Sequence, residues 1–122
     1  MKPIDLNRLQ DFSDGTESGL RDLVALVVSH VEECLLAIRR GVEDKDSEVI
    51  RTESHRGAGT FGACGAGPLS ARLTEIETLA GAQRLDAVSA LLPALEREVT
   101  RVREFLAGRC DAQDIAATKA EQ

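Results

Sequence analysis

The chain contains no Trp or Tyr, and its three Phe residues give an aromatic content of only 2%. Sites that recognise carbohydrate or single-stranded nucleic acid rely on aromatic rings for stacking, so this scarcity argues against both. No apolar run comes near the length of about eighteen residues that a transmembrane helix needs. The N-terminus also lacks the apolar segment of a signal peptide. The sequence therefore predicts a cytoplasmic protein without a membrane partner.

The charged and metal-binding side chains exclude further classes of function. Fifteen basic against twenty-one acidic residues give a net charge of −6, which disfavours DNA, RNA or an anionic membrane as the main partner. Cys34, Cys64 and Cys110 are widely spaced, and the chain has no Cys-x-x-Cys pair and only two histidines. We therefore expect reduced thiols and no metal site.

Hydrophobic residues make up 43% of the chain, and they recur at steps of three and four, the spacing of an amphipathic helix. Capping residues and helix breakers separate the periodic segments. Thr16, and either Asp46 or Ser47, are the expected N-caps, and Pro68 fits a first helical turn. These features predict one short helix and four long ones, over residues 4–12, 16–41, 46–64, 68–81 and 84–106.

Length and pattern together predict the fold. A chain of 122 residues suits one compact domain, and four long amphipathic helices with short connections favour an antiparallel bundle. We predict an all-α, antiparallel four-helix bundle over residues 1–108, with the short N-terminal helix as a lid. Residues 109–122 are rich in Ala, Asp and Gln, and they are predicted to form a flexible tail.

One segment of the third predicted helix has a composition that packing does not explain. His55 is followed by glycines at the fourth, seventh and tenth positions, and each glycine inside a helix costs about 1 kcal/mol relative to alanine. At about 100° per residue, His55 falls roughly 140° from Ile50, on the solvent face. The neighbours expected on that face are Glu48, Arg51, Thr52, Gly59 and Gly62, whereas Gly57, Phe61 and Cys64 are expected on the buried face. The pattern predicts an exposed imidazole beside bare backbone that another protein can approach.

The residues around His55 resemble the histidine-containing phosphotransfer (HPt) domains of bacterial phosphorelays. Counted from its histidine, the family has Gly at plus four, Gly-Ala at plus ten, Leu at plus fourteen and Leu-Glu near plus twenty-one. Counted from His55 without a gap, this chain has at the same positions Gly59, Gly65-Ala66, Leu69 and Ile76-Glu77. Asp46 matches the acidic residue that opens the family's active helix. The resemblance extends over residues 4–107.

Two positions depart from the family pattern. Gly57 stands where the family has a leucine, and Ala58 stands where it has a lysine that is thought to accommodate the phosphoryl group. A second alignment is also open, because residues 57–62 are similar to a run in some chemotaxis-kinase phosphotransfer domains. That register places Thr52 at the histidine position and His55 at the lysine position, and it requires an insertion before the fourth helix. We prefer the ungapped register.

The resemblance implies a stoichiometric phosphocarrier in a two-component phosphorelay. His55 would accept a phosphoryl group from an aspartate of a receiver domain and pass it on, which makes the chain a phosphoprotein. Gly59 and Gly62 would let the receiver approach. Ala58 cannot supply the positive charge of the family's lysine. Arg51, or with less support Arg56, would supply a positive charge to the phosphoryl group instead. Mg²⁺ would belong to the receiver, and this chain would need no cofactor.

A motif that the sequence lacks bears on catalysis, and the resemblance bears on partners. The sequence has no Gly-x-x-x-x-Gly-Lys-Ser/Thr loop for nucleotide phosphates, so the chain is not predicted to be an enzyme with kinase activity. Its partners would be response-regulator receiver domains, with a hybrid histidine kinase as a further candidate. We expect the protein to act as a monomer.

Two other interpretations stay open. The first is a degenerate HPt-like domain that binds receivers without accepting phosphate, which the missing lysine favours. The second is a structural helical adaptor, because heptad-like stripes can also serve dimerisation. A lone histidine on a helix surface is usually inert, and His30, which lies away from the glycine cluster, is assigned no role.

Overall fold

The computed structural model describes residues 2–13 and 15–121, with side chains described as far as Gly108. These residues form five helices joined by short turns, without a strand, so the all-α prediction is confirmed. The helices are α1 Leu6–Gln10, α2 Glu17–Glu43, α3 Ser47–Ala63, α4 Gly67–Gly81 and α5 Leu85–Glu121.

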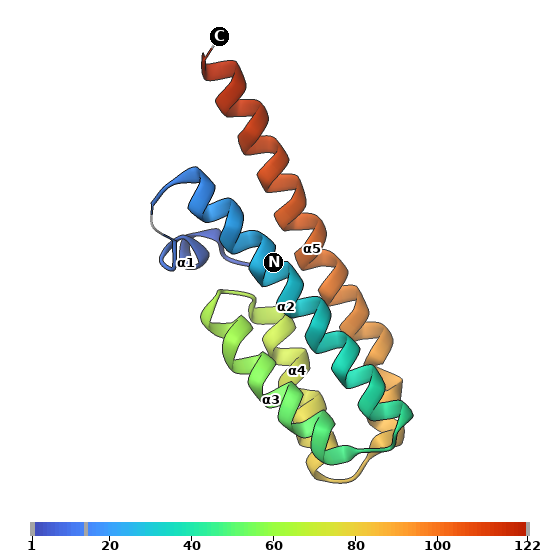
Figure 1. Ribbon diagram of the computed structural model, residues 1–122. Coiled ribbons are helices and arrows are strands. Elements are labelled where there is room, and N and C mark those ends of the chain that lie inside the picture. The colour runs from blue at the N-terminus through green and yellow to red at the C-terminus, as the bar shows by residue number, and fades with distance from the viewer. Residues whose placement is uncertain (1, 14, 122) are drawn as a thin grey trace.

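The four long helices form the predicted antiparallel bundle (Figure 1). α3 and α4 make a hairpin that packs against α2 through α3 and against α5 through α4, and α2 and α5 also pack against each other. Each long helix therefore has two neighbours around one core. α5 extends well past the α3–α4 hairpin, as Figure 1 shows.

The long helices begin at the capping residues that the sequence contains. Thr16 Oγ1 accepts a hydrogen bond from the Gly19 N–H at 2.9 Å, and Asp46 Oδ1 accepts one from the Val49 N–H at 3.1 Å. Each side chain satisfies one of the backbone donors that a first helical turn leaves unpaired. Both expected N-caps are confirmed, with Asp46 rather than Ser47 at the start of α3.

The apolar stripes of the sequence face one another in the core. On α3, Ile50 and Phe61 are at most 3% exposed, and Cys64, also expected on this face, is half-buried. The stripes of the other long helices are buried with them: Val24, Val27, Val31, Cys34, Ile38, Leu69, Leu73, Ile76, Val88, Leu95, Val99, Val102 and Leu106. Burial of apolar surface is the main favourable term in folding. It fixes the inner face of α3 and leaves the outer face available for function.

The short helix α1 covers the turn between α3 and α4. The Asp5 N–H donates to the Gly65 carbonyl at 2.9 Å, and Ile4 and Leu9 are fully buried. Gly65 has a φ of +89°, and a Cβ there would come 2.9 Å from the Asp5 Cβ. Glycine suits this left-handed conformation and this close approach. The break that ends α3 is therefore also the place where α1 packs.

The prediction that the last helix ends near Leu106 was wrong. Leu106 is the last residue of the buried stripe, but α5 continues to Glu121. The apolar stripe marks where core packing ends, whereas helical hydrogen bonding can continue through residues of good helix propensity. The side chains of residues 109–122 lie outside the described part of the chain. The division into a domain of residues 1–108 and a flexible tail stays a prediction.

Candidate functional site

His55 stands on the outer face of α3. Its side chain is 77% exposed, whereas Ile50 and Phe61 of the same helix are buried. The exposed imidazole predicted from helical spacing is therefore confirmed. The other histidine, His30, is also exposed but lies on α2.

A carboxylate of the neighbouring helix holds one nitrogen of this imidazole. His55 Nδ1 lies 2.6 Å from Oε2 of Glu77, a residue of α4 whose side chain is only 25% exposed. An ionised carboxylate can only accept a hydrogen bond, so Nδ1 is the nitrogen that carries the proton in this pair. In the neutral ring, Nε2 then keeps its lone pair. Because the ring is exposed, a partner protein can reach that nitrogen.

Close packing of α3 on α4 sets this contact. The Ser70 hydroxyl of α4 donates to the Ala58 carbonyl of α3 at 2.8 Å. Since the two helices run antiparallel from this point, Glu77 comes level with His55. Ala58, which stands at the family's lysine position, is half-buried in this interface. The site therefore takes a carboxylate from α4 and has no cation at the family's usual position.

Gly59 fits the predicted access to the imidazole. It lies one turn after His55 and is exposed, and a Cβ built there would meet nothing within 4 Å among the described residues. Intramolecular packing therefore does not require a glycine here, although an interior glycine weakens the helix by about 1 kcal/mol. Its effect is to leave the backbone bare beside the ring.

The prediction for Gly62 was wrong about the face on which it lies. Gly62 is half-buried, and a Cβ there would come 3.0 Å from the Ser70 hydroxyl oxygen. α4 covers this edge of α3, which a helical projection of one helix alone does not reveal. The small size of Gly62 serves the approach of the two helices.

Arg51 lies one turn before His55 and is paired with Glu48. Its Nε is 3.4 Å from Glu48 Oε2, and its Nη2 contacts Oε1 of the same carboxylate. The hydrogen bond and the charge of Glu48 raise the pKa of Arg51, and the charge of Glu77 raises that pKa further. The charge of Glu77, the residue that contacts His55, therefore also reaches Arg51.

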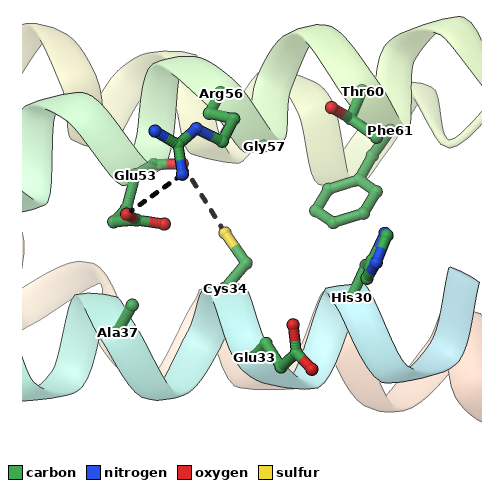
Figure 2. A pocket seen from close by; sticks show the side chains of 9 residues that line it. All are labelled: His30, Glu33, Cys34, Ala37, Glu53, Arg56, Gly57, Thr60 and Phe61. Carbon is green, nitrogen blue, oxygen red and sulfur yellow. Dashed lines mark hydrogen bonds and ion pairs between the residues drawn. The ribbon is translucent and has the colours of Figure 1, made fainter.

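Arg56 lies on the other side of α3, toward α2. It lines a groove of about 470 Å³ between these two helices, together with Glu53, Gly57 and Phe61 (Figure 2). Its Nη1 is 3.6 Å from Glu53 Oε1. Of the two predicted arginines, the structure therefore brings only Arg51 toward the α4 side of His55.

Gly57, the first departure from the family pattern, is explained by packing across the same groove. A Cβ there would come 2.8 Å from Cys34 Sγ and 3.1 Å from Leu73 Cδ1. Burial, with a smaller contribution from the charge of Glu53, raises the pKa of Cys34 to about 12. Cys34 is therefore a neutral thiol of low reactivity that occupies the space beside Gly57.

The remaining polar groups do not make a metal centre in the described part of the chain. There, no group of three or more His, Cys, Asp or Glu side chains could hold a metal ion. Cys34 and Cys64 are free thiols, and Cys110 lies outside the described side chains. None of the helices within the described residues combines the length and the apolar character needed to span a bilayer.

Comparison with known families agrees with this site. A model of the Hpt domain matches residues 22–105. The chain belongs to the Hpt domain family. Members of this family are phosphocarriers rather than kinases, and they work with receiver domains in phosphorelays. The resemblance drawn from the residues around His55 is thereby confirmed at the level of the family.

A solved structure shares the fold of this Hpt domain. It is the crystal structure of histidine-containing phosphotransfer protein B (HptB) from Pseudomonas aeruginosa PAO1, with a TM-score of 0.81 and 24% sequence identity. The match covers 90% of this chain and 96% of the HptB chain. At this identity it bears on the fold alone. A comparison with curated proteins found no match.

Glu77 is the member of the site that sequence reasoning missed. The sequence placed Ile76-Glu77 in the family pattern but assigned Glu77 no contact with the histidine. In the sequence, the one feature that links the two residues is that Glu77 stands 22 positions after His55, where the family pattern has a glutamate. The contact depends on how α4 folds back along α3, and helical spacing within one helix does not contain that information.

Proposed function

We propose that this Hpt domain carries a phosphoryl group on His55 within a two-component phosphorelay. The observation that supports this most is the pair formed by His55 and Glu77. The imidazole is 77% exposed, and its Nδ1 is held by a carboxylate at 2.6 Å. Such a ring presents the lone pair of Nε2 to a partner in a fixed orientation.

The proposed step is an in-line displacement on phosphorus. Nε2 of His55 attacks the phosphorus of an aspartyl phosphate on a receiver domain. The N–P bond forms as the bond from phosphorus to the aspartate oxygen breaks, and the carboxylate leaves with that electron pair. Nδ1 keeps its proton, so the phosphorylated ring becomes cationic and its charge faces the Glu77 carboxylate. The reverse step delivers the phosphoryl group to an acceptor aspartate.

The surroundings of His55 have proposed roles of their own. Gly59 leaves room for the receiver's backbone beside the ring. Arg51 supplies the positive charge that Ala58 does not. Arg56 and Gly62 have weaker support, because Arg56 lies toward α2 and Gly62 packs against α4. Mg²⁺ belongs to the receiver in this proposal, and the chain itself uses no cofactor.

The proposed partners are response-regulator receiver domains, with a hybrid histidine kinase as a further candidate. The chain acts in this proposal as a cytoplasmic monomer and a stoichiometric phosphoprotein. Co-sedimentation with a receiver, at one receiver per chain, would support this stoichiometry. An obligate dimer that covers His55 would instead favour the structural adaptor.

The decisive experiment is transfer from a phosphorylated receiver domain to the purified chain. We expect one phosphate that is labile to acid and stable to base, and we expect His55→Gln to abolish it. His30→Gln is the matched control, because His30 is also an exposed histidine on a helix. Thr52→Val tests the second alignment and should leave labelling unchanged. Labelling that persists in His55→Gln would exclude the assignment.

A degenerate domain that binds receivers without accepting phosphate is the second candidate. Ala58 favours it, because the lysine of the family pattern is missing. Measuring both receiver binding and phosphotransfer with the same receiver distinguishes the two candidate functions. Tight binding of a phosphorylated receiver without any phosphate on His55 would establish the second candidate.

A further inference from the structure

Arg51 and Glu48 form a surface ion pair beside the proposed phosphorylation site. They are one turn apart on α3, and their side chains are 45% and 73% exposed. An ion pair between exposed side chains is weak, because water screens the charges and holding two long side chains costs entropy. A stronger anion placed nearby can therefore take the guanidinium away from Glu48.

His55 is positioned to present such an anion. Side chains on a helix generally lean toward its N-terminus, which for His55 is the direction of Arg51, one turn earlier on α3. The stem of Arg51 runs along Gly81 of α4, where a Cβ would come 3.8 Å from Arg51 Cδ. Gly81 is one turn after Glu77, the residue that binds His55. The stem of Arg51, the imidazole and the Glu77 carboxylate therefore lie along one edge between α3 and α4.

We infer that phosphorylation of His55 draws Arg51 from Glu48 to the phosphoryl group, and that Glu48 thereby limits how long the phosphoryl group is retained. This inference rests on the proposed function of His55. A phosphoryl group carries roughly two negative charges and three acceptor oxygens. Guanidinium can bind it through two parallel hydrogen bonds. Glu48 competes for the same guanidinium, so the two anions share one cation.

The competition affects the lifetime of the phosphohistidine. In hydrolysis, a water oxygen bonds to phosphorus as the N–P bond breaks; the electron pair of that bond returns to Nε2, and dihydrogen phosphate leaves with both protons of the water. The transition state is loose, so electron density from the phosphoryl oxygens helps to break the N–P bond, and a bound guanidinium withdraws part of that density. Any contact that keeps Arg51 on Glu48 therefore shortens the lifetime. The effect on the lifetime should be measurable in this chain, because Ala58 replaces the lysine that would otherwise stabilise the phosphoryl group alongside Arg51.

The test measures hydrolysis of the phosphorylated chain after the phosphodonor has been removed. We expect Glu48→Gln to lengthen the half-life about twofold, a size typical of losing one helical ion pair. Arg51→Ala should shorten the half-life, and adding Glu48→Gln to Arg51→Ala should change nothing further. Glu98→Gln is the matched control, because Glu98 pairs with Arg101 at the same spacing on α5, and it should leave the half-life unchanged.

A second readout reports the exchange of partners directly. The Nε–H resonance of the Arg51 side chain should shift on phosphorylation of the wild-type chain. If His55 takes up no phosphate, the proposed function fails and this inference fails with it. If His55 is phosphorylated but Glu48→Gln leaves the half-life unchanged, only the exchange is wrong. An equal lengthening by Glu48→Gln in the Arg51→Ala background would likewise overturn it, since only a general charge effect would remain.

Discussion

His55 Nδ1 lies 2.6 Å from Glu77 Oε2, so one hydrogen bond across the α3–α4 interface joins a 77% exposed ring to a carboxylate that is only 25% exposed. An exposed side chain ordinarily samples several rotamers. This contact restricts the ring and determines which nitrogen is protonated. The proposed nucleophile is therefore oriented by the packing of a second helix and not by its own helix alone.

Replacing Glu77 with Ala should slow phosphotransfer about tenfold, a scale taken from the loss of the carboxylate that orients a metal-bound histidine. The ring would lose its acceptor at Nδ1, so both tautomers would become populated. Nitrogen NMR of His55 measures the tautomers, and rapid-quench transfer measures the rate. Glu75→Gln is the control, since Glu75 is a carboxylate of α4 that pairs with Arg72. Wild-type transfer by Glu77→Ala would refute the positioning role.

Two substitutions at Gly59 should separate its effect on stability from its effect on phosphotransfer. Gly59→Ala should raise the free energy of unfolding by about 1 kcal/mol, because alanine favours the helix and the added Cβ meets nothing within 4 Å. Gly59→Leu should keep the fold but slow transfer, since its bulk faces the partner. Gly108 has equally open surroundings on α5, so Gly108→Leu should leave transfer unchanged. Urea denaturation and transfer rates test both expectations, and rapid transfer by Gly59→Leu would contradict the second.

Gly57→Ala should lower the free energy of unfolding by about 1–3 kcal/mol, the usual cost of overpacking a core. The new Cβ would come 2.8 Å from Cys34 Sγ and 3.1 Å from Leu73 Cδ1. Combining it with Cys34→Ala should cost less than the sum of the two single changes by at least about 0.5 kcal/mol, because the two positions share the same space. Denaturation of the four chains completes the cycle. Strict additivity would show that Cys34 is not the neighbour that requires glycine.

Arg51→Ala should slow transfer by about threefold, since an exposed charge contributes modestly. Ala58→Lys should recover the rate in the Arg51→Ala background, because it restores a cation at the family's lysine position. Arg56→Ala is the matched control, and it should have no effect because Arg56 lies in the α2–α3 groove. An unchanged rate for Arg51→Ala would remove Arg51 from the site.

The sequence predicted the outer face of α3 only as far as the period of a single helix allows. The helical period placed Ile50 and Phe61 inside and His55 outside, and the structure agrees. The same projection misplaced Gly62, because it contains no information about where α4 lies. It placed Gly57 correctly on the buried face but gave no reason for its small size, which is the nearby Sγ of Cys34 on α2.

By itself the sequence determined the helices apart from the end of α5, the N-caps of α2 and α3, and the exposure of the imidazole, since these depend on residues near one another along the chain. Only the tertiary structure decided that Glu77 contacts His55, that the Arg51 side chain lies toward α4 and that Arg56 lines the α2–α3 groove. Those relationships join residues of different helices, or depend on which neighbouring helix a side chain meets. The packing of several buried faces sets the relative positions of the helices, and no single stripe in the sequence encodes them.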